Sequence, residues 1–119
     1  MSNLPKGKLG EDLATAYLLK KGYRIIARNF RAYPEEIDII ATHKNTLVFI
    51  EVKTRFSTSF GSAVEAITSR KLANLVKGAH YFKSLKPKLP ESLRIDLVAV
   101  QLTSVEKLVS IEHIENISG

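Results

Sequence analysis

The sequence predicts an α/β fold, a sandwich in which helices flank a mixed central β-sheet. A helical stripe of apolar residues opens the chain, and three strand-like runs follow it. A short polar turn joins two of these runs, which favours an antiparallel hairpin in the middle of the sheet. A second helix, long enough to cross over the sheet, separates the third run from a further strand. With 119 residues, we expect one domain that spans 1–119.

One helix and three strands are expected in the first half of the chain. Leu9, Leu13 and Tyr17 recur at helical spacing, and Gly22 is a suitable stop for this helix. Alternation and β-branched residues predict strands over 23–29, 36–42 and 46–54. Pro34 marks 30–35 as a turn or loop, because proline cannot donate to a strand ladder.

A second helix and two further strands are expected in the other half. Residues 55–64 are rich in serine and threonine, which predicts a loop. Thr68 or Ser69 can cap a helix that runs to about Leu85. The predicted apolar face of this helix comprises Leu72, Leu75, Val76, Ala79 and Phe82. The last strands are expected over 94–102 and 108–114.

Composition favours a protein that binds nucleic acid. The net charge is +6 and the pI about 9.7, so basic side chains can neutralise phosphates, although such a charge also serves solubility. The chain has no cysteine, which excludes disulfides and thiolate metal sites. It shows no signal-peptide core and no apolar run long enough to span a membrane. We therefore expect a cytoplasmic protein without a membrane partner.

Three ionisable residues, Asp38, Glu51 and Lys53, interrupt apolar strands. Charged residues are rare in strand interiors unless something pairs with them. A turn centred between Lys44 and Asn45 would pair Asp38 with Glu51 and Glu36 with Lys53, on one face of the sheet. Alternation likewise puts Glu36, Asp38 and Ile40 on one face of their strand. The pairing requires a symmetric turn, because a one-residue bulge would change the register.

Paired carboxylates at this position favour a metal site. Two adjacent carboxylates repel each other, and a divalent cation removes that repulsion. Mg²⁺ suits one or two carboxylates plus water and phosphate oxygens, with Mn²⁺ as a substitute, and the Val52 carbonyl is an additional candidate ligand. Lys53 could orient the attacking water, stabilise charge on the phosphate or hold a phosphate. The alternative is a surface ion pair between Glu36 and Lys53 with an incidental Asp38.

The chain resembles the YraN-like family of small bacterial proteins over about its first hundred residues. The resemblance is carried by Gly10-Glu11, Tyr17-Leu18, Gly22-Tyr23, Arg28-Asn29-Phe30-Arg31, Glu36-Ile-Asp38-Ile-Ile-Ala, Leu47-Val-Phe-Ile-Glu51-Val-Lys53-Thr-Arg55, Phe60-Gly61, Glu65-Ala66, Lys71 and Arg94-Ile-Asp96. The family is regarded as a group of predicted endonucleases. It is similar to archaeal Holliday junction resolvases and to the wider restriction-endonuclease-like fold, a three-layer sandwich with a PD-(D/E)-x-K motif.

The resemblance implies roles for individual residues. Asp38 matches the motif aspartate, while Glu51 and Lys53 match the second half of the motif. Glu11 matches a glutamate on the opening helix and would be a third catalytic and metal-binding carboxylate. By itself, Glu11 reads as a solvated residue near a helix N-terminus. Glu35 departs from the pattern, because the family usually has glycine there.

Several other side chains are candidates for weaker roles. Phosphate contacts are expected from Arg28, Arg31, Arg55, Arg70 and Lys71, of which Arg55 and Lys71 are preferred, since they flank the motif strand and the start of the second helix. The three histidines show no metal-ligand spacing and receive no role. Glu65 and Asp96 can be structural or can support the site. The core is expected to contain the phenylalanines together with Tyr17, Tyr23 and Tyr81, and no aromatic spacing indicates a base-stacking platform.

These observations predict a Mg²⁺-dependent endonuclease that hydrolyses phosphodiester bonds in DNA. Branched or otherwise structured DNA is the candidate substrate, and a homodimer would match the symmetry of such a substrate. One alternative is a nucleic-acid-binding module that kept the fold without catalysis, because fold does not establish activity. A weaker alternative is a protein-interaction domain whose charges form an ordinary surface.

Overall fold

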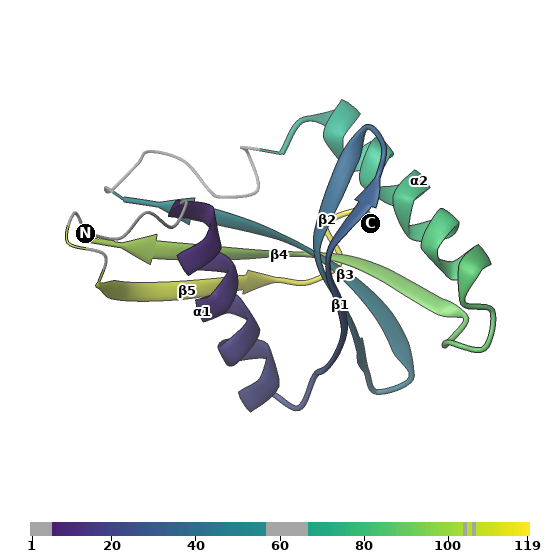
Figure 1. The fold of residues 1–119 in the computed structure, drawn as a ribbon, viewed down its shortest axis with the longest axis horizontal. Helices are drawn as coiled ribbons and strands as arrows, with labels where there is room; N and C mark the ends of the chain where they lie inside the picture. The colour runs from purple at the N-terminus through teal and green to yellow at the C-terminus, as the bar shows by residue number, and fades with distance from the viewer. Residues whose placement is uncertain (1–5, 57–66, 104, 106) are drawn as a thin grey trace.

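The computed structural model describes residues 6–56, 67–103, 105 and 107–119. Its elements are α1 (Lys6–Lys20), β1 (Arg24–Ala32), β2 (Glu35–His43), β3 (Thr46–Arg55), α2 (Ser69–Leu85), β4 (Ser92–Leu102) and β5 (Leu108–Ile114). The five strands form one sheet in the order β1-β2-β3-β4-β5 (Figure 1). None of the helices described is long and apolar enough to cross a membrane.

The sheet is mixed, as the sequence predicts. Only β3 and β4 pair in parallel, while the other three pairs of neighbours are antiparallel. A parallel pair needs a crossover connection, which α2 provides. Thr68 caps α2 as predicted, because its hydroxyl accepts a hydrogen bond from the Lys71 N–H at 3.0 Å.

One helix packs on each face of the sheet, so the fold has three layers (Figure 1). On the α1 face, Ala14 and Leu18 pack against Ile39, Ile50 and neighbouring strand residues. On the α2 face, the predicted apolar stripe of the helix packs against Ile40, Leu47, Phe49 and Ile95. This architecture is an α/β sandwich consistent with the restriction-endonuclease-like fold.

The β2–β3 hairpin has the predicted register. Lys44 and Asn45 have φ angles of 47° and 63°, the left-handed values that a two-residue type I′ turn requires. The ladder runs from His43 opposite Thr46 to Ile39 opposite Ile50. The symmetric turn therefore forms without the preferred Asn-Gly sequence, since asparagine tolerates this conformation.

The β1–β2 hairpin is longer than the sequence indicates. β1 extends to Ala32 and β2 begins at Glu35, so only Tyr33 and Pro34 connect them, and the prediction of a turn over 30–35 is wrong at both ends. Proline fixes its own position in the turn, but it does not prevent its neighbours from pairing. Phe30 continues the strand because its ring packs into the α2-side core.

The middle of β2 does not alternate regularly. Ile37 and Ile40 both pack on the α2 side, whereas Ile39 packs on the α1 side. Opposite this break lies Asn29, with a left-handed φ of 53°. The prediction that Glu36, Asp38 and Ile40 share one face is therefore wrong. The irregular backbone turns Asp38 toward β3, and the pairing of β2 with β3 ends at Ile39.

Candidate functional site

Asp38 and Glu51 lie where β2 and β3 separate. The ladder ends at Ile39 opposite Ile50, and the Asp38 carboxylate then accepts the Val52 N–H through Oδ2 at 2.8 Å. A side chain thus takes the place of a backbone carbonyl in the ladder. Glu51 is only 4% exposed. Asp38 is half-buried beside it, and two carboxylates placed in this way are unusual, because burial without compensation is costly.

The two carboxylates influence each other. The pKa of Asp38 is raised from 3.8 to about 7, first because the carboxyl is buried and second because Glu51 is negatively charged. The hydrogen bond from the Val52 N–H and the positive charge of Lys71 oppose this rise, while the charge of Glu11 adds to it. At neutral pH, Asp38 is therefore close to its point of half ionisation.

Lys71, at the start of α2, compensates part of this charge. Its ammonium lies 2.8 Å from Glu51 Oε2 and 3.7 Å from Glu35 Oε1. Burial opposes the charge of Lys71, but the hydrogen bond and charge of Glu51 outweigh it and raise the pKa of Lys71. The sequence predicted a phosphate contact for this residue, which remains a prediction. The structure instead shows an ion pair with Glu51.

Glu51 keeps one unused oxygen. Its Oε1 atom is buried without a hydrogen-bond partner, and the only other such side-chain atom among the residues described is Arg28 Nε. A buried carboxylate oxygen without a donor is suited to a cation. The donor set of Asp38 and Glu51, oxygen only, fits Mg²⁺. No three His, Cys, Asp or Glu side chains in the described part of the chain gather closely enough to hold a metal together.

Glu11 approaches the site from α1. Gly10 permits this approach, because a Cβ atom there would lie 1.8 Å from Thr54 Oγ1 on β3. Both carboxylate oxygens of Glu11 accept hydrogen bonds from Asn29 Nδ2 at 2.9 Å, and Oε1 also pairs with Arg28 at 3.2 Å. Glu11 is therefore held at the edge of the carboxylate pair by two donors. It is close enough to affect the charge of Asp38.

Asn29 links two carboxylates that sequence reasoning did not connect. The same Nδ2 group lies 3.3 Å from Glu36 Oε1. Glu36 was the proposed partner of Lys53, but no ion pair between them occurs within the described residues. Two features of the sequence could have indicated Asn29. It belongs to the family pattern, and asparagine is unfavourable in a strand.

The basic side chains that the sequence predicts to act on the substrate lie at different places in the fold. Lys53 follows Glu51 on β3, is partly exposed and forms no ion pair within the described ranges. Arg55 lies at the end of β3, whereas Arg70 is exposed in the first turn of α2. Arg31 is exposed near the tip of the β1–β2 hairpin. Glu65, together with residues 57–64 of the predicted loop, lies outside the described residues.

Asp96 belongs to a separate structural cluster. It is fully buried on β4 and accepts hydrogen bonds from Arg94 Nε at 2.8 Å, from His113 Nε2 at 2.8 Å and from the Asn116 N–H at 3.0 Å. Burial opposes ionisation, but these hydrogen bonds outweigh it and lower the pKa of Asp96. The cluster ties β5 and the following turn to β4. This gives His113 a role that its sequence spacing did not suggest.

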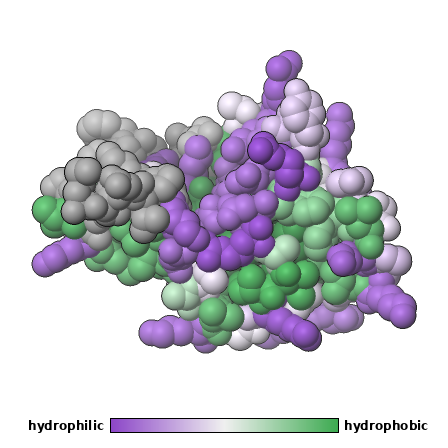
Figure 2. All heavy atoms as spheres, viewed as in Figure 1, coloured by the Kyte–Doolittle hydropathy of each residue, from purple (hydrophilic) through white to green (hydrophobic). Residues whose placement is uncertain are grey.

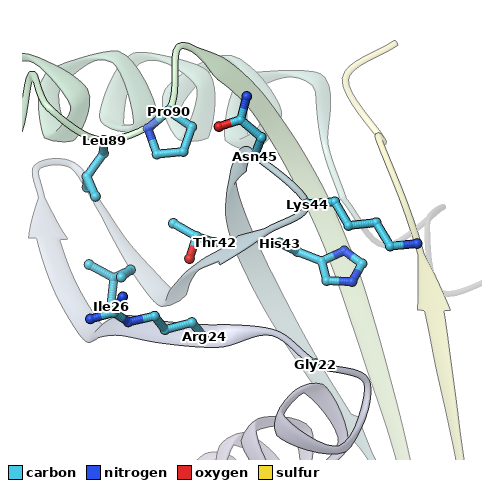
Figure 3. A pocket seen from close by; sticks show the side chains of 9 residues that line it. All are labelled: Gly22, Arg24, Ile26, Thr42, His43, Lys44, Asn45, Leu89 and Pro90. Atoms are coloured by element: carbon cyan, nitrogen blue, oxygen red, sulfur yellow. The ribbon is translucent and has the colours of Figure 1, made fainter.

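A hollow at the β2–β3 turn is not part of the carboxylate site. It has a volume of about 460 Å³ and lies between this turn and the segment before β4 (Figure 3). His43, Lys44 and Arg24 border it, and none of its nine described lining residues is acidic. The carboxylates of the candidate site, Asp38 and Glu51, lie at the other end of the hairpin.

Comparison with known proteins places the chain in a family. The profile of Uncharacterised protein family UPF0102 matches residues 10–100. The chain belongs to this family. A UPF0102 protein of Syntrophomonas wolfei is 40% identical over 114 residues, covering 96% of this chain and 97% of the relative. A UPF0102 protein of Chloroherpeton thalassium is 39% identical, covering 98% of this chain and 90% of the relative. A UPF0102 protein of Moorella thermoacetica is also 39% identical, covering 97% of this chain and 96% of the relative. This membership confirms the YraN-like resemblance, and the relatives' names give no activity.

Proposed function

We propose that this protein is a Mg²⁺-dependent endonuclease that hydrolyses phosphodiester bonds in DNA, with branched or structured DNA as the candidate substrate. The observation that supports this most is the pairing of the half-buried Asp38 with the buried Glu51, in which Glu51 Oε1 has no hydrogen-bond partner. A pair of this kind is unfavourable for stability alone, because two adjacent carboxylates held largely out of water repel each other. A cation-dependent function explains why both are present.

Asp38 and Glu51 would hold the metal, with the Val52 carbonyl as a further candidate ligand and Glu11 at the edge of the site. The bound ion would supply Lewis-acid stabilisation of the phosphate charge. The Val52 N–H fixes the orientation of the Asp38 carboxylate, since it donates to Oδ2 at 2.8 Å. A pair of carboxylates is sufficient, because Mg²⁺ keeps several water and substrate ligands.

Lys53 would act on the substrate directly. Its ammonium follows Glu51 on the same strand and is not engaged in an ion pair within the described ranges. A cation placed there stabilises the negative charge that develops on the phosphate in the transition state. Lys71 has a different task, because its ion pair limits the repulsion between Glu51 and Asp38.

The test is a cleavage panel with purified protein. Junction, flap, single-stranded and duplex DNA are incubated with Mg²⁺ or Mn²⁺. We expect cleavage of at least one substrate, and a loss of about 100-fold or more in Asp38→Asn and Lys53→Ala. Glu112→Gln and Lys88→Ala, which change exposed residues of the same charge types, are matched controls and should retain activity. Inactive wild-type protein on all four substrates with both metals would reject the proposal for those substrates.

Metal binding is measured separately from cleavage. Calorimetric titration with Mn²⁺ should give heat with the wild-type chain and with Lys53→Ala, but not with Asp38→Asn. Heat that persists in Asp38→Asn would place the metal elsewhere. This measurement distinguishes a defective metal site from a defective catalytic lysine.

A second candidate function is nucleic-acid binding without cleavage. The ion pair between Lys71 and Glu51 favours it, because an ammonium already compensates one of the two carboxylates. This function predicts salt-dependent DNA binding that survives Asp38→Asn, together with no cleavage by the wild type. In either case we propose a cytoplasmic protein, and a homodimer if the substrate is two-fold symmetric.

A further inference from the structure

A groove lies between α2 and the tip of the β1–β2 hairpin, which sits beside the helix in Figure 1. Its volume is about 460 Å³, and its lining comprises Arg31, Ala32, Tyr33, Lys77, Gly78 and Tyr81. Gly78 lets the hairpin approach the helix, since a Cβ atom there would lie 2.9 Å from the Ala32 Cβ. Small residues thus form the floor of the groove, and larger ones border it.

Two of the bordering residues are exposed tyrosines. Tyr33 is 91% exposed and Tyr81 is 53% exposed, so the prediction that Tyr81 belongs to the core is wrong. Tyr81 is held in place by Phe30, with ring centroids 6.1 Å apart, and Phe30 in turn packs edge-on against Phe82 at 4.9 Å. A 91% exposed aromatic ring adds nothing to the core. It offers a free π face to a ligand.

The charged residues of the groove are both cationic. Arg31 and Lys77 are exposed and border the two tyrosines, whereas the neighbouring Glu35 is engaged by Lys71 and by Asn74, at 3.7 and 3.4 Å. Figure 2 shows that the upper part of the face, where the hairpin tip lies, is mainly hydrophilic, while apolar surface lies lower on the molecule. Aromatic rings interleaved with cations match a ligand that has flat bases and a phosphate backbone.

We propose that this groove binds a single-stranded segment of nucleic acid, with unpaired bases stacked on Tyr33 and Tyr81 and phosphates paired with Arg31 and Lys77. The proposal rests on the proposed function in that the ligand class is the same. It does not require that the neighbouring carboxylate site cleaves the ligand. Stacking on tyrosine is tolerant of sequence, because every base has a π face.

The groove and the carboxylate site lie along the same face of α2. Lys71 contacts Glu51, Asn74 contacts Glu35, Gly78 faces Ala32, and Tyr81 contacts Phe30. Lys71 and Tyr81 are separated by about 15 Å along the helix axis, at about 1.5 Å per residue. At about 3.4 Å per stacked nucleotide, about four nucleotides span this distance. A strand seated on the tyrosines therefore leads to Asp38 and Glu51.

Binding is tested with fluorescein-labelled oligonucleotides by anisotropy, in EDTA so that no cleavage occurs. We expect Tyr33→Ala to weaken binding of a single-stranded 12-mer by about 5- to 100-fold, and Tyr33→Phe to bind like the wild type. Lys77→Ala should reduce the salt slope for the single strand by about 0.7. Val109→Ala, which trims exposed apolar surface on β5, and Lys88→Ala are the matched controls. Tyr33 is almost fully exposed, so its variants should fold.

Single-strand affinity within twofold of wild type in both Tyr33→Ala and Tyr81→Ala would overturn the proposal. An equal loss of duplex affinity would also overturn it, since the groove would then not select unpaired bases. Self-association that Tyr33→Ala abolishes, with unchanged oligonucleotide binding, would assign the groove to a protein contact instead. Binding that depends on the tyrosines, without cleavage, would support the proposed single-strand groove and reject the proposed nuclease function. Cleavage that does not depend on the tyrosines would support the nuclease function and reject the groove.

Discussion

Replacing Asp38 by asparagine should stabilise the protein at neutral and alkaline pH. The substitution keeps an oxygen that can accept the Val52 N–H, now 2.8 Å from Asp38 Oδ2, and removes a negative charge beside Glu51. Because the pKa of Asp38 is raised in the folded state, its ionisation opposes folding. Such a cost in stability fits the metal-binding role proposed for Asp38.

The magnitude follows from the pKa. A rise from 3.8 to about 7 corresponds to about 4 kcal/mol of lost stability above pH 7, at about 1.4 kcal/mol per pH unit. Burial of the asparagine amide costs about 1 to 2 kcal/mol, which offsets part of the stability that the variant gains. We therefore expect Asp38→Asn to be about 2 to 3 kcal/mol more stable than the wild type at pH 8. With an m-value of about 2 kcal/mol/M, the urea midpoint rises by about 1 to 1.5 M.

The sign of the pH dependence is fixed by linkage. Between pH 3.8 and about 7 the folded state binds more protons at Asp38 than the unfolded state, so stability falls as pH rises through this window. The advantage of Asp38→Asn should therefore be small at pH 4 and reach its full size above pH 7. Urea denaturation in EDTA from pH 4 to pH 8, followed by circular dichroism, measures it.

Asp12→Asn is the matched control. A hydrogen bond from Arg28 is the largest cause that lowers the pKa of this exposed carboxyl, so its removal should have the opposite sign and a small size. The reasoning fails if Asp38→Asn is less stable than the wild type at pH 8, or if the difference between them does not change with pH. Either result would mean that Asp38 is ionised at little cost in the folded protein.

Three further predictions concern other contacts. Gly10→Ala should lower the free energy of unfolding by about 1 to 3 kcal/mol, since the new methyl group would meet Thr54 Oγ1, and adding Thr54→Ala should restore part of the loss. Asp96→Asn should lower the free energy of unfolding by about 3 to 5 kcal/mol at pH 7, because Arg94 loses its buried partner. Below about pH 4 the difference between variant and wild type should shrink, because Asp96 becomes protonated in the wild type. Lys71→Met should destabilise the chain at pH 8 more than at pH 5, because the charge of Lys71 favours ionised Asp38, which is protonated at pH 5.

Urea denaturation measures all three, and each has a distinct contrary result. A Gly10→Ala variant as stable as the wild type would mean that α1 shifts on the sheet without lowering the free energy of unfolding. Equal destabilisation by Asp96→Asn at pH 3 and pH 7 would assign the effect to packing rather than charge. Lys71→Met stability that is independent of pH would mean that the ion pair contributes little.

Much of the site follows from the sequence because the β2–β3 hairpin is local. A two-residue turn between Lys44 and Asn45 sets the register, and alternation along β3 then gives the positions of Glu51 and Lys53. The order of helices and strands follows equally from apolar periodicity and from the length of the crossover helix.

The contacts of these residues could not be predicted in the same way. The break in β2 lies opposite the left-handed Asn29 of a different strand, and the apolar pattern of β2 itself does not indicate it. The ion pair of Lys71 with Glu51 depends on how α2 lies on the sheet. The sequence predicts Tyr81 in the core and indicates no position for Tyr33, whereas both are exposed in the structure, because the β1–β2 hairpin extends beside α2.

The parallel pairing of β3 with β4 has a consequence for the order of folding. The β2–β3 hairpin closes a two-residue turn and can form in microseconds, whereas β4 can pair with β3 only after α2 has crossed the sheet. Asp38 and Glu51 therefore meet early, and Lys71 reaches Glu51 only with the crossover. We expect the folding rate to rise at mildly acidic pH, where a protonated Asp38 removes the early repulsion. The carboxylate pair is thus assembled in two steps, and the second step, the arrival of Lys71, coincides with completion of the sheet.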